Sequence, residues 1–279
     1  MNAIHEFSSL SFWKTLGKRI QESDLTGFAA QLAYFFLLSL FPLLIFLVTL
    51  LSYLPFTVTD VLDTVRNYAP GQTMDTVEET LTEVMTNRNG GLLSFGIIAT
   101  IWTASNGMNA VIKSLNRAYE VSEERPFYIQ RGLSVLLTIG MILVFIIALL
   151  LPVFGKQIGN VLDGFFGFSQ LFDILWGGLR FLVSPLVLIT IFIGVYYLAP
   201  NLKIKCTSAF PGAIFATLGW ILISLAFSFY VSNFANYSAT YGSIGGIIVL
   251  MVWFYLTGII LLVGGEINAL MNNRLNKRC

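Results

Sequence analysis

Charged residues are scarce in this chain of 279 residues: 11% are Asp, Glu, Lys or Arg, whereas 56% are hydrophobic. Soluble domains carry about 25% charged residues. Too few charges are present to coat a water-soluble globule, and the mean hydropathy of +0.77 agrees with this shortage. The composition therefore excludes an ordinary soluble domain and predicts a multi-span membrane protein.

Cysteine and histidine are nearly absent as well, with two Cys and one His in the chain. The cysteines, Cys206 and Cys279, do not make a disulfide framework. We expect both on the cytoplasmic side, where thiols stay reduced. The single histidine, His5, has no second histidine to work with in acid–base chemistry.

Long apolar runs fill most of the chain, and six of them can cross a bilayer core of about 30 Å as helices. We expect these spans at about Ala29–Leu51, Leu92–Ile112, Leu133–Phe154, Trp176–Ala199, Phe210–Val231 and Ser243–Gly265. Pro42 and Pro185 lie inside the first and fourth spans, where proline kinks a helix. The spans form one predicted transmembrane domain, 29–269, between a cytoplasmic or interfacial segment, 1–28, and a basic cytoplasmic tail, 270–279.

Two amphipathic regions flank the first span. Leu10, Trp13, Leu16 and Ile20 share roughly one helical face with basic residues mostly elsewhere, which predicts an interfacial helix; a solvated basic arm is the alternative. Residues 57–90 repeat apolar positions at helical spacing on both sides of a turn at Ala69-Pro70-Gly71. We expect an amphipathic helical hairpin there, whose carboxylates form a solvated face rather than a metal site.

The distribution of positive charge sets the orientation. Twelve of the 16 Lys and Arg residues lie on the side of the termini in this arrangement. Short cytoplasmic loops carry an excess of such residues. The expected fold is therefore an all-α bundle of six transmembrane helices in the inner membrane, with both termini cytoplasmic, an N-terminal interfacial helix and an extracytoplasmic helical hairpin.

The second span carries a polar stripe that ends at Arg117. Its members recur every three or four residues: Trp102, Asn106, Asn109, Lys113 and Asn116. Buried amides in membranes either hold helices together or line a hydrated pathway, and the sequence leaves both open. Near the start of the first span, Gln31 and Tyr34 share a face, where we expect packing at the kink, with a substrate contact as the alternative.

Glu266 ends a run from Ser243 to Gly265 that carries no charge. An ionisable group at membrane depth is a functional hypothesis by default. The alternative is a carboxylate near the interface that pairs with a neighbouring cation. We expect that cation to be Lys113 or Arg117, at the cytoplasmic end of the second span, with Asn268 facing the same pathway.

Several stretches, taken in order, resemble one family, the YihY/virulence factor BrkB proteins, long also labelled ribonuclease BN-like. They are Ala29-Ala-Gln-Leu-Ala-Tyr34 through Ser39-Leu-Phe-Pro42, Trp102-Thr-Ala-Ser-Asn-Gly-Met-Asn-Ala-Val-Ile112, Leu115-Asn-Arg-Ala-Tyr119 with Arg125-Pro-Phe127, Tyr241-Gly-Ser-Ile-Gly-Gly246, Trp253, and Gly264-Gly-Glu-Ile-Asn268. The resemblance implies a six-helix inner-membrane protein. Some members are linked to serum resistance or suggested to move lipids or glycolipids.

The ribonuclease label finds no support in the residues. Metal-dependent nucleases need clustered carboxylates or histidines, and metal-independent ones commonly use histidine. His5 is alone, and the acidic cluster belongs to the outer hairpin, on the wrong side for cytoplasmic RNA. The chain is therefore predicted not to be an enzyme, with no catalytic residues, cofactor, metal or nucleic-acid partner.

Two functions remain as hypotheses. The first is transport or translocation of a membrane lipid or another envelope-related substrate, along the polar stripe with Glu266 and Asn268 opposite. The absence of nucleotide-binding motifs favours passive or ion-coupled movement, or dependence on partner proteins. The alternative is a membrane scaffold that binds another envelope protein through its outer hairpin.

Overall fold

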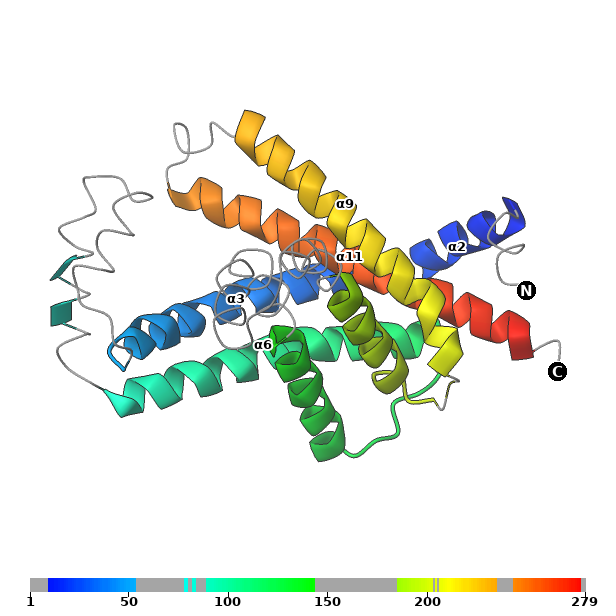
Figure 1. Cartoon of the computed structure of the whole chain (residues 1–279). Coiled ribbons are helices and arrows are strands. Elements are labelled where there is room, and N and C mark those ends of the chain that lie inside the picture. Colours follow the sequence, from blue (N-terminus) through cyan, green and yellow to red (C-terminus); the bar gives the residue numbers. More distant parts are fainter. Residues whose placement is uncertain are drawn as a thin grey trace, which may run out of the picture. The chain divides into compact units, whose positions relative to one another are not determined.

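A computed structural model describes residues 10–53, 78–79, 82–83, 89–143, 185–202, 204, 206–234 and 243–276. Regular secondary structure within these ranges is helical throughout, which confirms the predicted all-α class (Figure 1). The elements are α2 (Leu10–Glu22), α3 (Leu25–Leu51), α6 (Gly90–Ala118), the short 3-10 helix η2 (Cys206–Ala209), α9 (Phe210–Phe234) and α11 (Ser243–Asn276), together with the helices Phe127–Leu143 and Pro185–Leu198.

Three of the described helices are long and apolar enough to cross a membrane. They contain the segments Leu25–Leu50, Phe210–Tyr230 and Gly245–Asn272, with mean hydropathies of 2.4, 1.9 and 2.6. These segments match the first, fifth and sixth predicted spans. The second predicted span is helical throughout as part of α6, whose polar stripe makes it less apolar than these three.

The remaining predictions of topology are only partly covered by the described residues. The third and fourth predicted spans contain the shorter apolar helices Phe127–Leu143 and Pro185–Leu198. Residues 144–184 and nearly all of the predicted hairpin, 57–90, lie outside the described part. The bundle of six spans, the hairpin and the orientation of the termini therefore stay predictions.

The chain divides into two compact units. One is Phe35–Ala104, and the other combines Met1–Tyr34 with Ser105–Cys279. Within the first unit, Gly96 of α6 lies so close to α3 that a Cβ atom there would be 2.8 Å from the Phe46 backbone nitrogen. The helix α3 continues through Pro42, and Pro185 is the first described residue of its helix, so both kinks stay predictions.

In the larger unit, α2 packs on the C-terminal part of α11 (Figure 1). Phe12 and Leu16 are buried against Ile267, Leu270 and Met271. Trp13 stays 46% exposed, so the buried face is rotated from the predicted one, with Phe12 in place of Trp13. The predicted helix is confirmed, but its apolar face meets protein; its place at the membrane surface stays a prediction.

Small residues bring the first half of α9 close to α11. A Cβ atom on Gly212 would stand 2.1 Å from the Gly264 carbonyl oxygen, and Ala213 and Ala216 are fully buried. Small side chains allow helices to approach closely where lipid supplies no hydrophobic drive. The two helices therefore pack tightly against each other, and the apolar groove described below lies between them.

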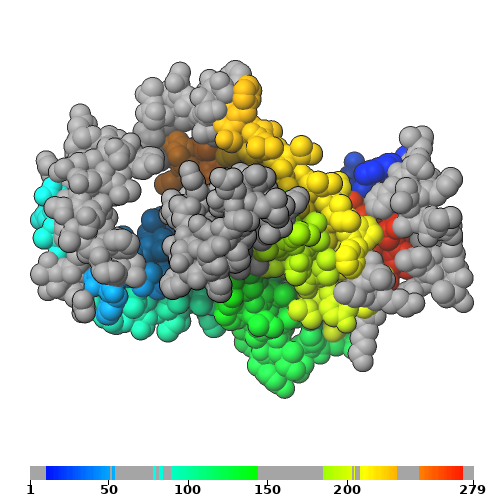
Figure 2. Space-filling view, in the orientation of Figure 1, coloured from blue at the N-terminus to red at the C-terminus, as the bar shows by residue number. Residues whose placement is uncertain are grey.

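The opposite face of α9 is apolar and exposed, and its surface is yellow to gold in Figure 2. The exposed side chains recur at helical spacing: Ile214 (46%), Leu218 (58%), Leu222 (66%), Leu225 (64%) and Phe229 (64%). Contiguous apolar surface of this kind marks a membrane or protein contact. For a helix that is also a candidate span, the face suits lipid hydrocarbon.

Candidate functional site

The first two amides of the polar stripe are bonded to the helix that follows α6. Asn106 Oδ1 accepts a hydrogen bond of 2.6 Å from Arg131 Nη1, and Asn109 Oδ1 accepts one of 2.9 Å from Gln130 Nε2. Both donors lie in the first turns of the helix Phe127–Leu143. These contacts favour the helix-holding alternative for this part of the stripe.

Asn116, the last amide of the stripe, is buried in a polar network at the end of α6. Its Nδ2 donates to Glu123 Oε2 (2.8 Å), and its Oδ1 accepts from the Asn201 backbone nitrogen (2.7 Å). Arg125 Nε donates to Glu123 Oε1 (2.7 Å), and its Nη2 donates to the Ala199 carbonyl (2.7 Å). The hydrogen bond from Arg125 holds the pKa of Glu123 below its ordinary value, and that from Asn116 adds to the effect.

Other predicted site residues lie apart from these contacts. Lys113 is exposed, as are Gln31 and Tyr34, the latter to 53%.

Asn268 is fully buried, and it binds the first turn of α9: its Oδ1 accepts from Gly212 N (2.7 Å) and its Nδ2 donates to the Ala209 carbonyl (3.1 Å). Asn268 therefore caps a helix start.

Glu266 is only 2% exposed, and its cation partner is not one of the two predicted residues. Arg19 Nε of α2 donates to Glu266 Oε2 at 3.0 Å. The expected pairing with Lys113 or Arg117 is therefore corrected to Arg19. The physical reason is that the packing of Phe12 and Leu16 brings the next turn of α2 over the end of α11.

Two arginines cap each other's helices beside this ion pair. Arg19 also donates through Nη2 to the carbonyl of Ala118, the last residue of α6, and its Nη1 lies 3.4 Å from Glu120 Oε1. Arg117 Nη2 donates to the carbonyl of Glu22, the last residue of α2, at 2.8 Å. Cations at helix C-termini bind unpaired carbonyls and complement the helix dipole.

An open polar cavity of about 220 Å³ lies among these groups. Six residues line it: Arg19, Glu22, Ser23, Arg117, Glu120 and Glu266. Ser23 is 8% exposed, and its hydroxyl makes no hydrogen bond within the described structure. The sequence prediction included Arg117 and Glu266 of this group but missed the contribution of α2.

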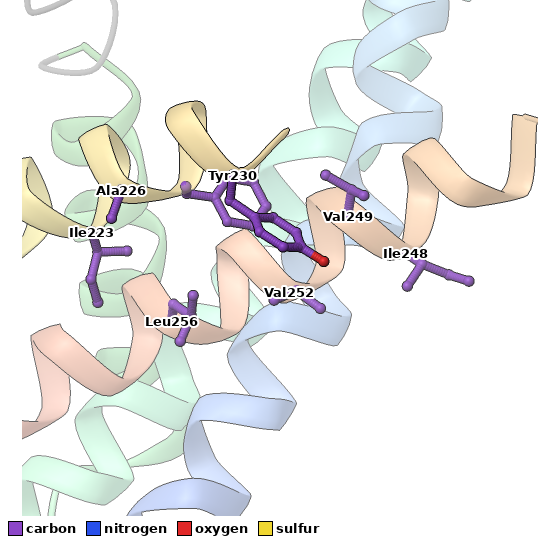
Figure 3. A pocket seen from close by; sticks show the side chains of 8 residues that line it. Ile223, Ala226, Tyr230, Ile248, Val249, Val252 and Leu256 are labelled. Atoms are coloured by element: carbon purple, nitrogen blue, oxygen red, sulfur yellow. The ribbon is translucent and has the colours of Figure 1, made fainter. Parts of the chain in front are cut away.

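A second, apolar groove of about 440 Å³ lies between α9 and α11. Figure 3 shows the side chains of Ile223, Ala226 and Tyr230 coming from α9, and those of Ile248, Val249, Val252 and Leu256 from α11; Phe227 completes the lining. All of these residues except Tyr230 are apolar. Sequence reasoning missed the groove, because both helices are apolar on every side and no periodicity marks the lining.

Among the described residues, no group of three or more His, Cys, Asp or Glu side chains is placed to hold a metal ion. The predicted acidic face at 57–90 lies almost wholly outside these residues. The expectation that the chain has no metal site stays a prediction.

The family model described as virulence factor BrkB matches residues 16–278. A putative ribonuclease-like protein, YfkH, of Bacillus subtilis is 56% identical over 95% of this chain and 96% of its own length. Membrane proteins described as UPF0761 from Aliivibrio salmonicida and Photobacterium profundum are each 31% identical. They cover 94% and 95% of this chain and 83% and 82% of their own lengths. No solved structure matches.

Proposed function

The chain belongs to the virulence factor BrkB family of membrane proteins, and from this premise we propose that it moves a membrane lipid between leaflets. The observation that carries the proposal is the apolar groove between α9 and α11. Its volume of about 440 Å³ falls in the range of roughly 300–1,000 Å³ that is usual for small-molecule sites.

The position of the groove favours an acyl chain as its occupant. Its lining residues lie in the candidate spans Phe210–Tyr230 and Gly245–Asn272, so the surrounding medium is hydrocarbon. Lipid tails are as apolar as leucine, so burial alone supplies no drive for binding within the membrane. The groove would therefore hold a chain by its shape and by packing contacts with rings such as Phe227 and Tyr230.

The hydrogen bonds of Asn106 and Asn109 change where we place the path of the lipid. Asn106 and Asn109 are bonded to the helix Phe127–Leu143, so a passing headgroup would have to displace Arg131 and Gln130. We therefore assign these two amides to helix association. The proposed lipid moves along the α9–α11 pair, with its chain in the groove.

A matched pair of variants tests the groove. Ile247 and Ile248 are neighbours with 47% and 50% exposure, and only Ile248 is among the lining residues. In proteoliposomes with a fluorescent phospholipid and an external quencher, Ile248→Trp is expected to slow translocation severalfold, whereas Ile247→Trp leaves it near the wild-type rate. Failure of the folded wild type to move any lipid would overturn the proposal.

The alternatives have weaker support. The Bacillus subtilis relative carries a ribonuclease-like name. We propose that this chain is not an enzyme, and RNA cleavage by the purified protein that survives removal of trace nucleases would contradict that. The scaffold hypothesis depends on the hairpin at 57–90, and its partner and the inner-membrane orientation stay predictions.

A further inference from the structure

The polar cavity at the ends of α2 and α6 is separate from the apolar groove between α9 and α11, and the proposed function gives it no role. We infer that it binds the zwitterionic phosphoethanolamine headgroup of a phospholipid. The inference names the headgroup of the lipid in the proposed function and rests on that function for its choice of a lipid. It is argued from position, an unpartnered hydroxyl and the two signs of charge in the lining.

The cavity lies at a boundary of the candidate spans. Ser23 stands two residues before the span Leu25–Leu50, and Glu266 lies near the end of the span Gly245–Asn272. Residues just outside an apolar span lie at the depth of lipid headgroups. A ligand in this cavity is therefore in contact with the layer where phosphates and amines of lipids are concentrated.

Ser23 provides the observation that points to a ligand. It is only 8% exposed, lines the cavity and makes no side-chain hydrogen bond in the described structure. Buried polar groups in native proteins almost always have a partner, so each exception needs an explanation. Because the Ser23 hydroxyl oxygen is covered in the described structure, it would donate to a phosphate oxygen in the cavity after a rotation about χ1.

Arg117 supplies positive charge for the same phosphate. One of its N–H groups is bonded to the Glu22 carbonyl, and a guanidinium carries five N–H donors in a planar fork. Donors therefore remain for a phosphate, which arginine binds well through paired hydrogen bonds. Arg19, in contrast, is held by Glu266 and by Ala118.

The carboxylates in the lining disfavour a ligand that carries only negative charge. Two arginines face three glutamates, which gives the lining a formal charge of −1. Glu266 is matched by Arg19 at 3.0 Å. Glu22 and Glu120 lie 3.6 Å from Lys18 and 3.4 Å from Arg19, but their side chains are 64% and 72% exposed, and such exposed pairs are weak enough to be exchanged for a ligand. A ligand with a phosphate and a primary ammonium satisfies both signs, since the ammonium carries three donors for these carboxylates.

The backbone at Glu120 fits this assignment. Its φ is 58°, in the left-handed region that favours glycine, and it occupies the C′ position of a Schellman motif at the end of α6. The motif is defined by bonds from Glu120 N to Arg117 O and from Val121 N to Asn116 O, both of 3.0 Å. A glutamate at a position that favours glycine is explained if its carboxylate has a binding role.

The cavity also has the necessary room. Its volume of about 220 Å³ far exceeds the roughly 10–15 Å³ that one water molecule requires. Phosphatidylcholine carries a bulkier quaternary ammonium without N–H donors, and phosphatidylglycerol carries no cation. We therefore expect the order of affinity to be phosphatidylethanolamine first, with the other two clearly weaker.

The test measures lipid binding by the full chain purified in detergent, using native mass spectrometry with the three phospholipids of identical acyl chains. The wild type is expected to bind phosphatidylethanolamine about tenfold more tightly than phosphatidylcholine. Glu120→Gln removes a carboxylate assigned to the ammonium and should reduce this preference severalfold. Ser23→Ala removes a contact to the phosphate, which all three lipids share, so it should weaken the binding of each lipid severalfold and leave the preference unchanged. Matched controls, Glu124→Gln and Ser122→Ala, change exposed residues of the neighbouring loop outside the cavity and should preserve both affinity and preference.

The outcomes separate binding from folding and from movement. Ser23→Ala removes a hydroxyl without a described partner, so it should unfold at the wild-type temperature or slightly above. Equal binding of the three lipids, or strongest binding of phosphatidylglycerol, would overturn the inference. So would binding of soluble phosphoethanolamine without any preference among the lipids. Because the assay needs no translocation, headgroup selectivity without lipid movement would overturn the proposed function alone.

Discussion

Arg19 and Arg117 each donate a hydrogen bond to the last carbonyl of the other's helix, Arg19 to Ala118 of α6 and Arg117 to Glu22 of α2. The exchange joins an N-terminal helix to a helix about 95 residues later in the chain. It also fixes Arg19 where it meets the buried Glu266. The two bonds look equivalent, yet the surroundings predict very different effects of removing each arginine.

Removal of Arg19 should destabilise the protein strongly. Arg19→Gln leaves Glu266, whose side chain is 3% exposed, without its cation. Breaking one side of a buried ion pair costs about 3–5 kcal/mol. Arg117→Gln, at an exposed residue, should cost about 1 kcal/mol. Thermal unfolding of both variants in detergent measures the difference.

The double variant Arg19→Gln with Glu266→Gln is the control for this pair. It removes the uncompensated charge together with its partner, so it should recover most of the stability that Arg19→Gln loses. If the double variant is no more stable than Arg19→Gln alone, the ion pair is not the source of the loss.

In the Schellman turn after α6, a substitution is expected to stabilise the protein rather than destabilise it. Replacing Glu120 by glycine removes a side chain from a backbone with φ of 58°. The left-handed conformation costs a residue with a Cβ atom roughly 1–2 kcal/mol, so Glu120→Gly should raise the unfolding temperature. The lost contact with Arg19 is between an exposed carboxylate and a cation and offsets little of this gain. A lower unfolding temperature would contradict the strain argument.

Local patterns in the sequence predicted the helices well. The apolar runs of α3, α9 and α11 and the amphipathic period of α2 each depend on neighbouring residues alone. The buried face of α2 was predicted less well. Phe12 and Trp13 are adjacent large apolar residues, so helical periodicity alone does not decide which of them is buried. The choice between them is made by α11, at the other end of the chain.

Side-chain partners were harder to predict because they depend on how helices are rotated toward one another. Glu266 and Arg19 are 247 positions apart. The depth of Lys113 and Arg117 along α6 suggested them as partners, but depth does not specify which side of a helix faces α11. The spacing of polar residues along α6 is visible in the sequence, but only the donors Gln130 and Arg131 show what Asn109 and Asn106 bind.

Acid should weaken the network around Glu123. The pKa of this carboxyl is lowered in the folded chain, chiefly by the hydrogen bond from Arg125. Its contribution to stability is therefore present above the unfolded-state pKa of about 4.5 and is lost as the pH falls through the lower folded-state value. Unfolding temperatures between pH 7 and 3 should fall less steeply for Glu123→Gln than for the wild type. Parallel curves for the two proteins would contradict this assignment.

Tight contact between α9 and α11 predicts that Gly212 does not tolerate even a methyl group. A Cβ atom there would lie 2.1 Å from the Gly264 carbonyl oxygen and 2.5 Å from Asn268 Nδ2, so the helices would have to separate. Overpacking of this kind costs typically 1–3 kcal/mol, and the displaced Asn268 would also lose its bond to Gly212 N. Gly212→Ala should therefore lower the unfolding temperature markedly.

The matched control for that variant is Gly194→Ala, in the helix Pro185–Leu198. A Cβ atom at Gly194 meets nothing within 4 Å, and alanine favours a helix interior over glycine by roughly 0.5–1 kcal/mol. Gly194→Ala should unfold at a temperature equal to or above that of the wild type. Because Gly212 lies on the same helix pair as the groove, separation of α9 from α11 should also slow lipid translocation. Loss of stability in Gly212→Ala with an unchanged translocation rate would show that the spacing of these helices does not control the path.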